Sequence, residues 1–331
     1  MGLLGRPECV EGGMSLIDRI TSCIRQAIAP AIKTSRWILT ITVPVSFAVL
    51  LLKLTGLLPI MASIFAPLFA WFGMPGESAL VFVTAGLVNI YACIGVLNTL
   101  ELSSRTVTIL ALMCLISHNL PVETAVQRKT GTPLSRTLLV RLGASFAGAC
   151  ILNVLLPADM QVMAAATKTV AAAEWGREVM DWLVGTSALC IKIVFLITLL
   201  MILQRVLQEF GITRMLTSIL KYPLMALGIP HQAAFLWIVA NTLGLAYGAG
   251  VIIDQVERGE LSAKNADILN YHIAISHSLL EDTLLFVAIG VPVLWITIPR
   301  VILAGIAVWL KRLLDWVFMP VGRPGSSLDA D

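Results

Sequence analysis

Residues 117–126 read SHNLPVETAV and place a histidine, a carboxylate and a proline inside an otherwise apolar part of the chain. Residues 276–285 read SHSLLEDTLL and repeat the same order. In both segments, serine and histidine are followed by four other residues, then by an acid and a threonine. Ionisable side chains are costly inside a membrane and by default mark a functional site there. These two segments therefore predict where helices are broken and where a site lies.

The composition indicates a protein that crosses a membrane several times. Of 331 residues, 58% are hydrophobic and 13% are charged, whereas soluble domains carry about 25% charged residues. The mean hydropathy is +0.89. The net charge of +3 is weak, and loop lysines and arginines account for it, so no nucleic-acid partner is expected. We expect an all-α polytopic membrane protein in a bacterial inner membrane, with the lipid bilayer around it.

The cysteines and the N-terminus give no sign of a secreted domain. The six cysteines are scattered without CxxC or CxxH spacing, which favours buried thiols over a disulfide or zinc framework. No cofactor is expected. The first residues are polar and contain glycine, so we expect no cleavable signal peptide, and Met14 is an alternative start.

Apolar runs of about 20 residues, the length that crosses a bilayer, predict the membrane spans. The clear runs are residues 37–57, 78–98, 138–157, 183–203 and 232–253. Shorter apolar pieces at 59–73 and 211–227 are predicted as interfacial helices. Residues 15–36 have isoleucines at helical spacing among basic residues, which predicts an amphipathic helix on the cytoplasmic surface.

The two polar segments belong to a larger repeat. At an offset of 159 residues, His118 pairs with His277 and Arg141 pairs with Arg300. Such agreement in order, spacing and chemistry indicates two halves with one plan. The expected parts are an N-terminal segment with the amphipathic helix (1–36), a first repeat (37–157), an external linker helix (158–182), a second repeat (183–318) and a disordered tail (319–331).

Loop charges give each half a direction. The basic residues in 15–36 and in the loop 128–136 predict that both are cytoplasmic, and both chain termini are expected there too. Residues 104–126 are therefore predicted to form a re-entrant hairpin, broken at SHNLP, that returns the chain to this loop. The second half then repeats the plan upside down. Its hairpin, at 265–290, enters from the opposite face and leaves Lys264 outside.

Broken helices from opposite faces are a common way to build a midplane transport site, because freed backbone groups survive in lipid only when buried in protein or lining a wet cavity. Pro121 suits the first turn after the break, where a helix start leaves an N–H unpaired anyway. In the second copy, Ser278 and Glu281 fit a capping box. The helix N-termini would turn their positive ends toward the membrane centre, where an anion or polar group can bind.

Two SH-x4-[DE]-T segments in broken helices, each preceded by a glycine-rich span, resemble the nucleoside-recognition or Gate-domain membrane proteins. That group is similar to the gate region of bacterial ferrous-iron transporters and, more distantly, to concentrative nucleoside transporters. The resemblance covers about residues 37–318 and implies an inner-membrane, transport-type fold with both motifs in the hairpins. The chain has no GxxxxGK[ST] motif, so a pump driven by its own GTP hydrolysis is not expected.

The candidate substrate- or ion-binding residues are the motif side chains and polar residues of the flanking spans. They are His118, Asn119, Glu123, Thr124, His277, Ser278, Asp282, Thr283, Asn89 and Asn241. The histidine–acid pairs suit proton coupling or ion coordination, and the alternative is a buried histidine tied to a helix-capping acid. Metal binding by these histidines and acids is chemically reasonable but has no CxxC or HExxH pattern behind it, so it stays undecided. The asparagines either contact substrate or join helices.

The remaining polar residues are interpreted as structural. Arg141 and Arg300 are read as positive-inside or interface anchors, and Arg300, on the outer side, is also a candidate anion ligand. His231 and His272 have no counterparts in the first half.

These patterns favour a transporter of a small polar or anionic solute, nucleoside-like metabolites included. It would work by alternating access at one midplane site between the repeats, with coupling to protons or cations. A non-transporting or lipid-handling membrane protein and a divalent-metal permease are the alternatives, and a homo-oligomer is left open. No enzyme is expected, since a membrane hydrolase needs a nucleophile with a base in reach, or a ligated metal, and no inverted copies of one hairpin.

Overall fold

The chain forms an all-α polytopic membrane protein, as its composition predicts. The computed structural model describes residues 15–157, 160, 175–242 and 245–317, and no β-strand occurs within them. Among these residues, five helical stretches are long and apolar enough to cross a membrane. They are Leu16–Leu54, Ser104–Lys129, Leu134–Leu155, Trp175–Leu207 and Val293–Val317.

The helices include two sets that share one plan. In chain order they are α1 (Leu16–Leu54), α2 (Leu57–Ala70), α3 (Ser78–Leu87), α4 (Ile90–Leu97), α5 (Ser104–Ser117), α6 (Leu120–Lys129), α7 (Leu134–Leu155), α8 (Trp175–Glu209), α9 (Ile212–Ala226), the 3₁₀ turn η1 (His231–Ala233), α10 (Ala234–Thr242), α11 (Leu245–Glu257), α12 (Ala263–Ser276), α13 (Glu281–Val287) and α14 (Val293–Val317). Residues 156–174 lie between α7 and α8. Helices α2 and α9 occupy the two short apolar pieces. Their interfacial position stays a prediction.

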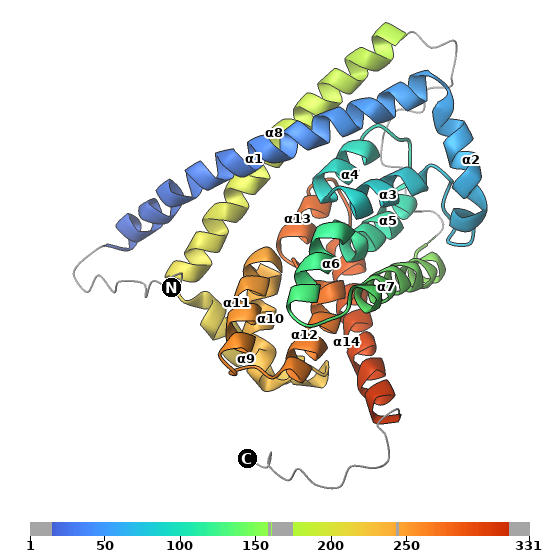
Figure 1. The fold of residues 1–331 in the computed structure, drawn as a ribbon. Coiled ribbons are helices and arrows are strands. Elements are labelled where there is room, and N and C mark those ends of the chain that lie inside the picture. Colours follow the sequence, from blue (N-terminus) through green and yellow to red (C-terminus); the bar gives the residue numbers. More distant parts are fainter. Residues whose placement is uncertain (1–14, 158–159, 161–174, 243–244, 318–331) are drawn as a thin grey trace.

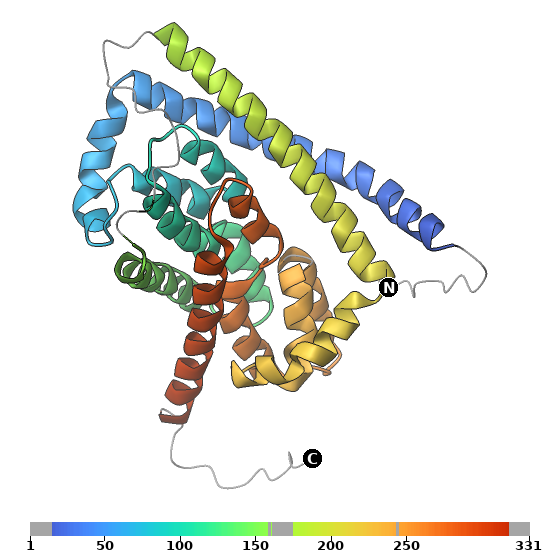
Figure 2. The ribbon, with the colours of Figure 1, turned by 180° about the vertical axis from the view of Figure 1, so that it is seen from behind.

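Helices α1 and α8 lie side by side and extend beyond the other helices (Figures 1 and 2). Arg19 Nε lies 2.9 Å from a carboxylate oxygen of Glu209, and Lys53 Nζ lies 3.0 Å from one of Glu178. The start of α1 therefore meets the end of α8, and the end of α1 meets the start of α8. The two helices are antiparallel.

The predicted separate amphipathic helix at 15–36 is wrong, because α1 runs without a break into the first predicted span. Its start is fixed by a capping box between Ser15 and Asp18. Residues 33–40 contain neither glycine nor proline, so nothing in the sequence stops the helix there. Likewise, residues 175–182 of the predicted linker belong to α8. Most of that linker and the tail at 319–331 lie outside the described residues.

The predicted span 78–98 is two helices. It is broken at Asn89, which adopts an extended conformation and accepts a hydrogen bond of 2.8 Å from the Ala92 N–H. This is an N-cap that begins α4. The prediction of a continuous helix at 78–98 is therefore wrong. The predicted span 232–253 contains α10 and most of α11, and the junction of α10 and α11 at 243–244 lies outside the described residues.

The SH segments break helices as predicted. Helix α5 ends at His118 and α6 follows it, while α12 ends at His277 and α13 follows it. In both breaks, one residue other than glycine has a left-handed backbone: Asn119 has a φ of 49° and Ser278 a φ of 52°. These residues stand 159 positions apart, like the histidines before them. The repeat therefore extends from sequence to backbone conformation.

The predicted fold-back at 104–126 is wrong. Arg105 of α5 donates to Asn153 of α7, and Ser117 contacts Ser145, so α7 is antiparallel to α5. The residues of α7 that contact the break at His118 lie about two turns after the start of α7. Only residues 130–133 join α7 to α6. Four residues reach about 13 Å, too short for an α6 folded back along α5. Helices α5 and α6 thus form one interrupted span.

The second half has the same arrangement. Lys311 of α14 lies 3.0 Å from Asp267 near the start of α12, and Arg300 donates to the carbonyl of Ile275 near its end. Helix α14 is therefore antiparallel to α12, as α7 is to α5. The predicted re-entrant hairpin at 265–290 is replaced by the interrupted pair α12 and α13.

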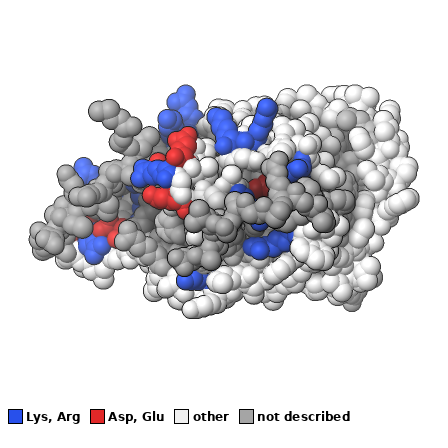
Figure 3. Space-filling model, turned by 60° about the horizontal axis from the view of Figure 1, so that its bottom comes forward, with Lys and Arg blue, Asp and Glu red and all other residues white. Residues whose placement is uncertain are grey.

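The two interrupted segments run in opposite directions. Asp267 accepts a hydrogen bond of 2.7 Å from Thr132, and Asn270 lies 3.1 Å from Thr130, so α12 begins where α6 ends. The loop 128–136 and Lys264 are thus at one end of the fold, and their predicted placement on opposite faces is wrong. Lysine and arginine side chains gather on the lower face of the molecule (Figure 3).

Helix α5 lies in the core, enclosed by its neighbours. All of its residues from Thr106 to Ser117 are buried. A cluster of buried apolar side chains surrounds it, with members from α3, α4, α7 and α14. The interruption at His118 therefore opens into protein and not toward the outer surface.

Candidate functional site

Two histidines from different halves meet where the interrupted segments cross. The Nε2 atoms of His118 and His277 are 3.3 Å apart, and the centroids of their rings are 4.9 Å apart. The two residues are 6% and 0% exposed. The two SH segments, predicted to share one site, are thus in direct contact.

Each histidine is held by the last turn of its own helix. His118 Nδ1 lies 3.2 Å from the carbonyl oxygen of Cys114, and His277 Nδ1 lies 2.8 Å from that of Ile273. A carbonyl oxygen only accepts, so Nδ1 carries the hydrogen in both rings. Both rings therefore turn Nε2 toward the other ring, where this atom either carries a second proton or offers its lone pair to a cation.

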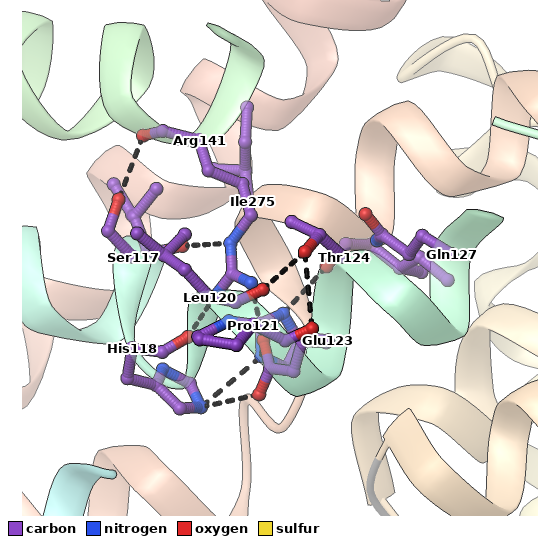
Figure 4. A network of polar contacts seen from close by, with 12 residues as sticks. Ser117, His118, Leu120, Pro121, Glu123, Thr124, Gln127, Arg141 and Ile275 are labelled. Atoms are coloured by element: carbon purple, nitrogen blue, oxygen red, sulfur yellow. Dashed lines mark hydrogen bonds and ion pairs between the residues drawn. The ribbon is translucent and has the colours of Figure 1, made fainter. Parts of the chain in front are cut away.

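Two carboxylates connect the histidines crosswise. Glu123, from α6, has one oxygen 3.1 Å from His118 Nε2 and the other 2.9 Å from His277 Nε2. Asp282, from α13, lies 3.2 Å from His118 Nε2. Figure 4 shows the contacts around His118 and Glu123. We call His118, Glu123, His277 and Asp282 the central cluster. Both halves are needed to form it.

Arg141, whose sequence position predicts an anchor, completes the first half of the site. Arg141, from α7, is fully buried and lies 2.7 Å from a carboxylate oxygen of Glu123. Its guanidinium also donates to the carbonyls of Ile116, at 2.8 Å, and His118, at 2.6 Å. The break removes the usual helical partners of these carbonyls. Arg141 therefore donates to the carbonyls that the break leaves without helical partners, and it balances the charge of Glu123 (Figure 4).

Arg300 takes the same place in the second half. It is fully buried, donates to the carbonyls of His277 at 2.6 Å and Ile275 at 3.3 Å, and lies 3.3 Å from the Thr283 hydroxyl. The interpretation of both arginines as interface anchors is wrong. Their repeat spacing of 159 residues was the available signal, because it ties each arginine to one SH segment.

The formal charges of the site nearly cancel. Arg141 and Arg300 carry two positive charges, and Glu123 and Asp282 carry two negative charges. Glu281, next to Asp282 and partly buried, adds a third carboxylate. With neutral imidazoles, this group carries one negative charge, so one proton or one cation makes its charge zero or positive. A proton on one Nε2 would also turn the contact between the histidines into an N–H···N hydrogen bond.

The residues in the left-handed conformation act through their backbones. The Asn119 N–H donates to the Ala85 carbonyl of α3 at 2.8 Å, and the Ser278 N–H donates to the Ala240 carbonyl of α10 at 3.3 Å. Each break is thus attached to the helix pair that precedes it. The side chain of Asn119 makes no cap bond. The structure gives these two residues a positioning role.

The predicted capping box of Ser278 and Glu281 is wrong. Ser278 has a left-handed backbone, α13 starts only at Glu281, and the cap position before it is Leu280, without a side-chain bond. The Glu281 carboxylate instead accepts a hydrogen bond of 3.0 Å from the Tyr91 hydroxyl of α4. Sequence spacing alone does not fix the backbone angles that a capping box needs.

The other candidate residues bond mainly to nearby backbone. The Thr124 hydroxyl donates to the Leu120 carbonyl within α6. Asn89 caps α4, and the Asn241 amide donates to the Trp237 carbonyl of its own helix at 2.9 Å. These side-chain bonds lie outside the central cluster, so contact of the two asparagines with substrate stays a prediction.

The remaining histidines are outside the cluster. His272 is buried and accepts a hydrogen bond of 2.9 Å from the Trp237 indole, with Ser276 also in contact at 2.8 Å. His231 is exposed at the start of η1. Both placements agree with a structural role. Only His118 and His277 join an acid from the other half.

The central cluster offers donor atoms for a metal ion. One atom each from His118, His277 and Asp282 lies within 4.8 Å of the other two, and all three residues are buried. These donors come from the ends of three elements that the repeat brings together.

Comparisons with known proteins agree with the prediction that the chain is a membrane protein. The chain is 29% identical over 261 residues to "Uncharacterized membrane protein YvoD" of Bacillus subtilis (strain 168), which covers 78% of this chain and 84% of that protein. No family model matches the chain, and no solved structure matches it. The chain is a membrane protein. Its chemistry must be inferred from the site.

Proposed function

We propose that this chain is an inner-membrane transporter that moves a small polar or anionic solute by alternating access. The observation that supports it most is the central cluster, in which oppositely directed halves place ionisable side chains in one buried contact. Buried ionisable groups in a membrane protein are expensive and by default mark an ion or substrate pathway. Interrupted helices with a site at their junction are typical of transporters. Membership of the nucleoside-recognition or Gate-domain group is part of the proposal.

The central cluster would couple the movement of the solute to the movement of a proton or another cation. His118 lies between two carboxylates, and its Nε2 is also 3.3 Å from that of His277. Loading one proton brings the formal charge of the group to zero, while releasing it leaves one negative charge. Separating the halves is therefore cheaper in one protonation state than in the other, since an uncompensated charge inside protein is costly.

A polar network at one end of the fold would act as a gate on that side. Lys311 lies 3.0 Å from Asp267 and 2.8 Å from Asp315, and Asp267 accepts a hydrogen bond from Thr132. Asn270 donates to Thr130 in the same region. Opening a path to the cluster between α6 and α12 would break the bonds of Thr130 and Thr132 to α12, while Lys311 keeps α12 attached to α14. The network would therefore hold this end closed until the site is loaded.

Lateral transport of lipid and a purely structural role are the competing functions. A structural protein needs no change in the exposure of the cluster, whereas alternating access requires exposure to each side in turn. Thr124 suits this test because it is 2% exposed and follows Glu123 in the sequence.

The test uses Thr124→Cys in a chain without its native cysteines, in vesicles of both orientations. A small impermeant thiol reagent should modify this cysteine slowly from each face. Ala111→Cys, in the fully buried middle of α5, is the matched control and should stay unmodified. Protection of Thr124→Cys from both faces, or reaction from only one, would contradict alternating access.

A further inference from the structure

We propose that the central cluster binds one divalent transition-metal ion of the zinc type, with His118, His277 and Asp282 as ligands and Glu123 beside them. This inference deepens the proposed transport function and rests on it for its role, because the ion would be the coupling ion or the cargo. Binding itself can be measured without transport.

Two of the three distances between the donor atoms fit one small ion, and the third is at most 4.8 Å. The Nε2 atoms of the histidines are 3.3 Å apart, and Asp282 Oδ2 is 3.2 Å from that of His118. Ligands held at about 2.0–2.1 Å from a tetrahedral Zn²⁺ lie about 3.3–3.4 Å from each other. Small side-chain shifts would therefore seat an ion among the three donors.

The histidines are already oriented as ligands. A histidine that binds a metal usually donates its other ring N–H to a carbonyl or carboxylate, which fixes the tautomer and the ring direction. Both rings satisfy this condition through the carbonyls of Cys114 and Ile273. His118 Nε2 lies against oxygens of two carboxylates, which only accept, so this position calls for a positive charge. A cation bound between the rings would supply that charge in place of a proton and would use the lone pairs of both Nε2 atoms.

Glu123 and Arg141 set how firmly the ion is held. One oxygen of Glu123 lies 2.9 Å from His277 Nε2, and the same oxygen is 2.7 Å from Arg141. Glu123 can therefore move between the guanidinium and the ion. Three ligands with an exchangeable fourth suit an ion that must enter and leave, whereas closed structural sites use four fixed ligands.

The donor set selects the class of ion. Two imidazoles and carboxylates suit first-row divalent ions such as Zn²⁺ and Co²⁺, whereas Ca²⁺ and Mg²⁺ prefer oxygen donors throughout. No thiolate donates here, which disfavours Cu⁺. Because protons compete for Nε2, the metal should bind more weakly as the pH falls.

The experiment is a titration of purified, chelator-treated protein with Co²⁺, followed by its visible absorption. We expect one Co²⁺ per chain with the intense bands of a tetrahedral site, and displacement by Zn²⁺ but not by Mg²⁺. His277→Ala and Asp282→Asn should weaken the affinity at least about tenfold, by loss of a ligand. His231→Ala, at an exposed histidine, should bind like the wild-type protein.

X-ray absorption of the wild-type Zn²⁺ complex needs no variant and guards against variants that fail to fold. It should show nitrogen and oxygen ligands at about 2.0–2.1 Å, with imidazole among them. Absence of a tetrahedral Co²⁺ spectrum, or the same spectrum in folded His277→Ala, would overturn the metal site. If that happens while Thr124→Cys still reacts from both faces, the transport proposal stands without the metal. If the metal binds and Thr124→Cys is protected, the transport proposal alone fails.

Discussion

Removing Arg141 should destabilise the protein far more than removing a surface arginine of similar geometry. In Arg141→Met, the carboxylate of Glu123 loses its partner at 2.7 Å and the carbonyls of Ile116 and His118 lose their donors. Breaking a buried ion pair from one side costs about 3–5 kcal/mol. Because two carbonyls are also left without a donor, we expect a loss at the upper end, about 5 kcal/mol of unfolding free energy.

The matched control is Arg19→Met, which removes the ion pair with Glu209 at 2.9 Å. Both side chains of that pair are about 40% exposed or more, so its loss should cost less than about 1 kcal/mol. The assay is equilibrium unfolding of detergent-solubilised protein by increasing SDS. A loss for Arg141→Met no larger than for Arg19→Met would refute the inference that Arg141 compensates a buried charge.

A double variant separates charge from packing. Arg141→Met with Glu123→Gln removes both charges, so no uncompensated carboxylate remains buried. We expect the double variant to be more stable than the sum of the single losses implies, by about 1–3 kcal/mol. Strict additivity would show that the two side chains do not interact, contrary to their contact in the site.

Two further predictions concern the helices that support the site. Asn119→Val should cost about 1–2 kcal/mol in the same unfolding assay, because a β-branched residue is strained at a φ of 49°, while Asn119→Gly should stay close to wild type. Gly148→Ala should destabilise by about 1–3 kcal/mol, since its Cβ would lie 2.9 Å from Leu112 Cδ2. Gly143→Ala, with nothing within 4 Å, should be neutral or stabilising. Equal effects at the two glycines would contradict the close packing of α7 on α5.

The site could be located from sequence because its two halves repeat. The spacing of 159 residues pairs the histidines, the acids and the arginines, and polar groups in apolar segments are rare enough to be informative. The crosswise bonds of Glu123 to His277 and of Asp282 to His118 could not be predicted. They depend on how two segments more than a hundred residues apart pack together.

The path of the chain was harder to predict than the positions of its breaks. Loop charges place a loop on one side of a membrane, but the number of crossings also depends on which apolar segments are continuous. The run at 78–98 is apolar on both sides of Asn89, so hydropathy suggests one span. The signal for two helices was the N-cap asparagine before an apolar run. Without this signal, the sequence predicts that the chain folds back at 104–126, and this places Lys264 on the wrong side.

Arg141 shows why burial is difficult to recognise. An arginine inside an apolar helix resembles an interfacial anchor whose charge reaches water. Its actual partners, Glu123 and the carbonyls of a broken helix, come from other elements. Only the three-dimensional arrangement shows that the guanidinium is satisfied inside the protein.

The measurement that most directly tests the central claim is the sidedness of four single cysteines in a chain without native cysteines. The claim is that two oppositely directed halves cross the membrane and meet at the central cluster. Arg128→Cys, Lys264→Cys, Glu101→Cys and Ala288→Cys are all at exposed positions at the ends of the interrupted segments. An impermeant thiol reagent should label positions 128 and 264 from one face, and 101 and 288 from the other. Labelling of 128 and 288 from the same face would contradict the opposite directions of the halves and the site built from them.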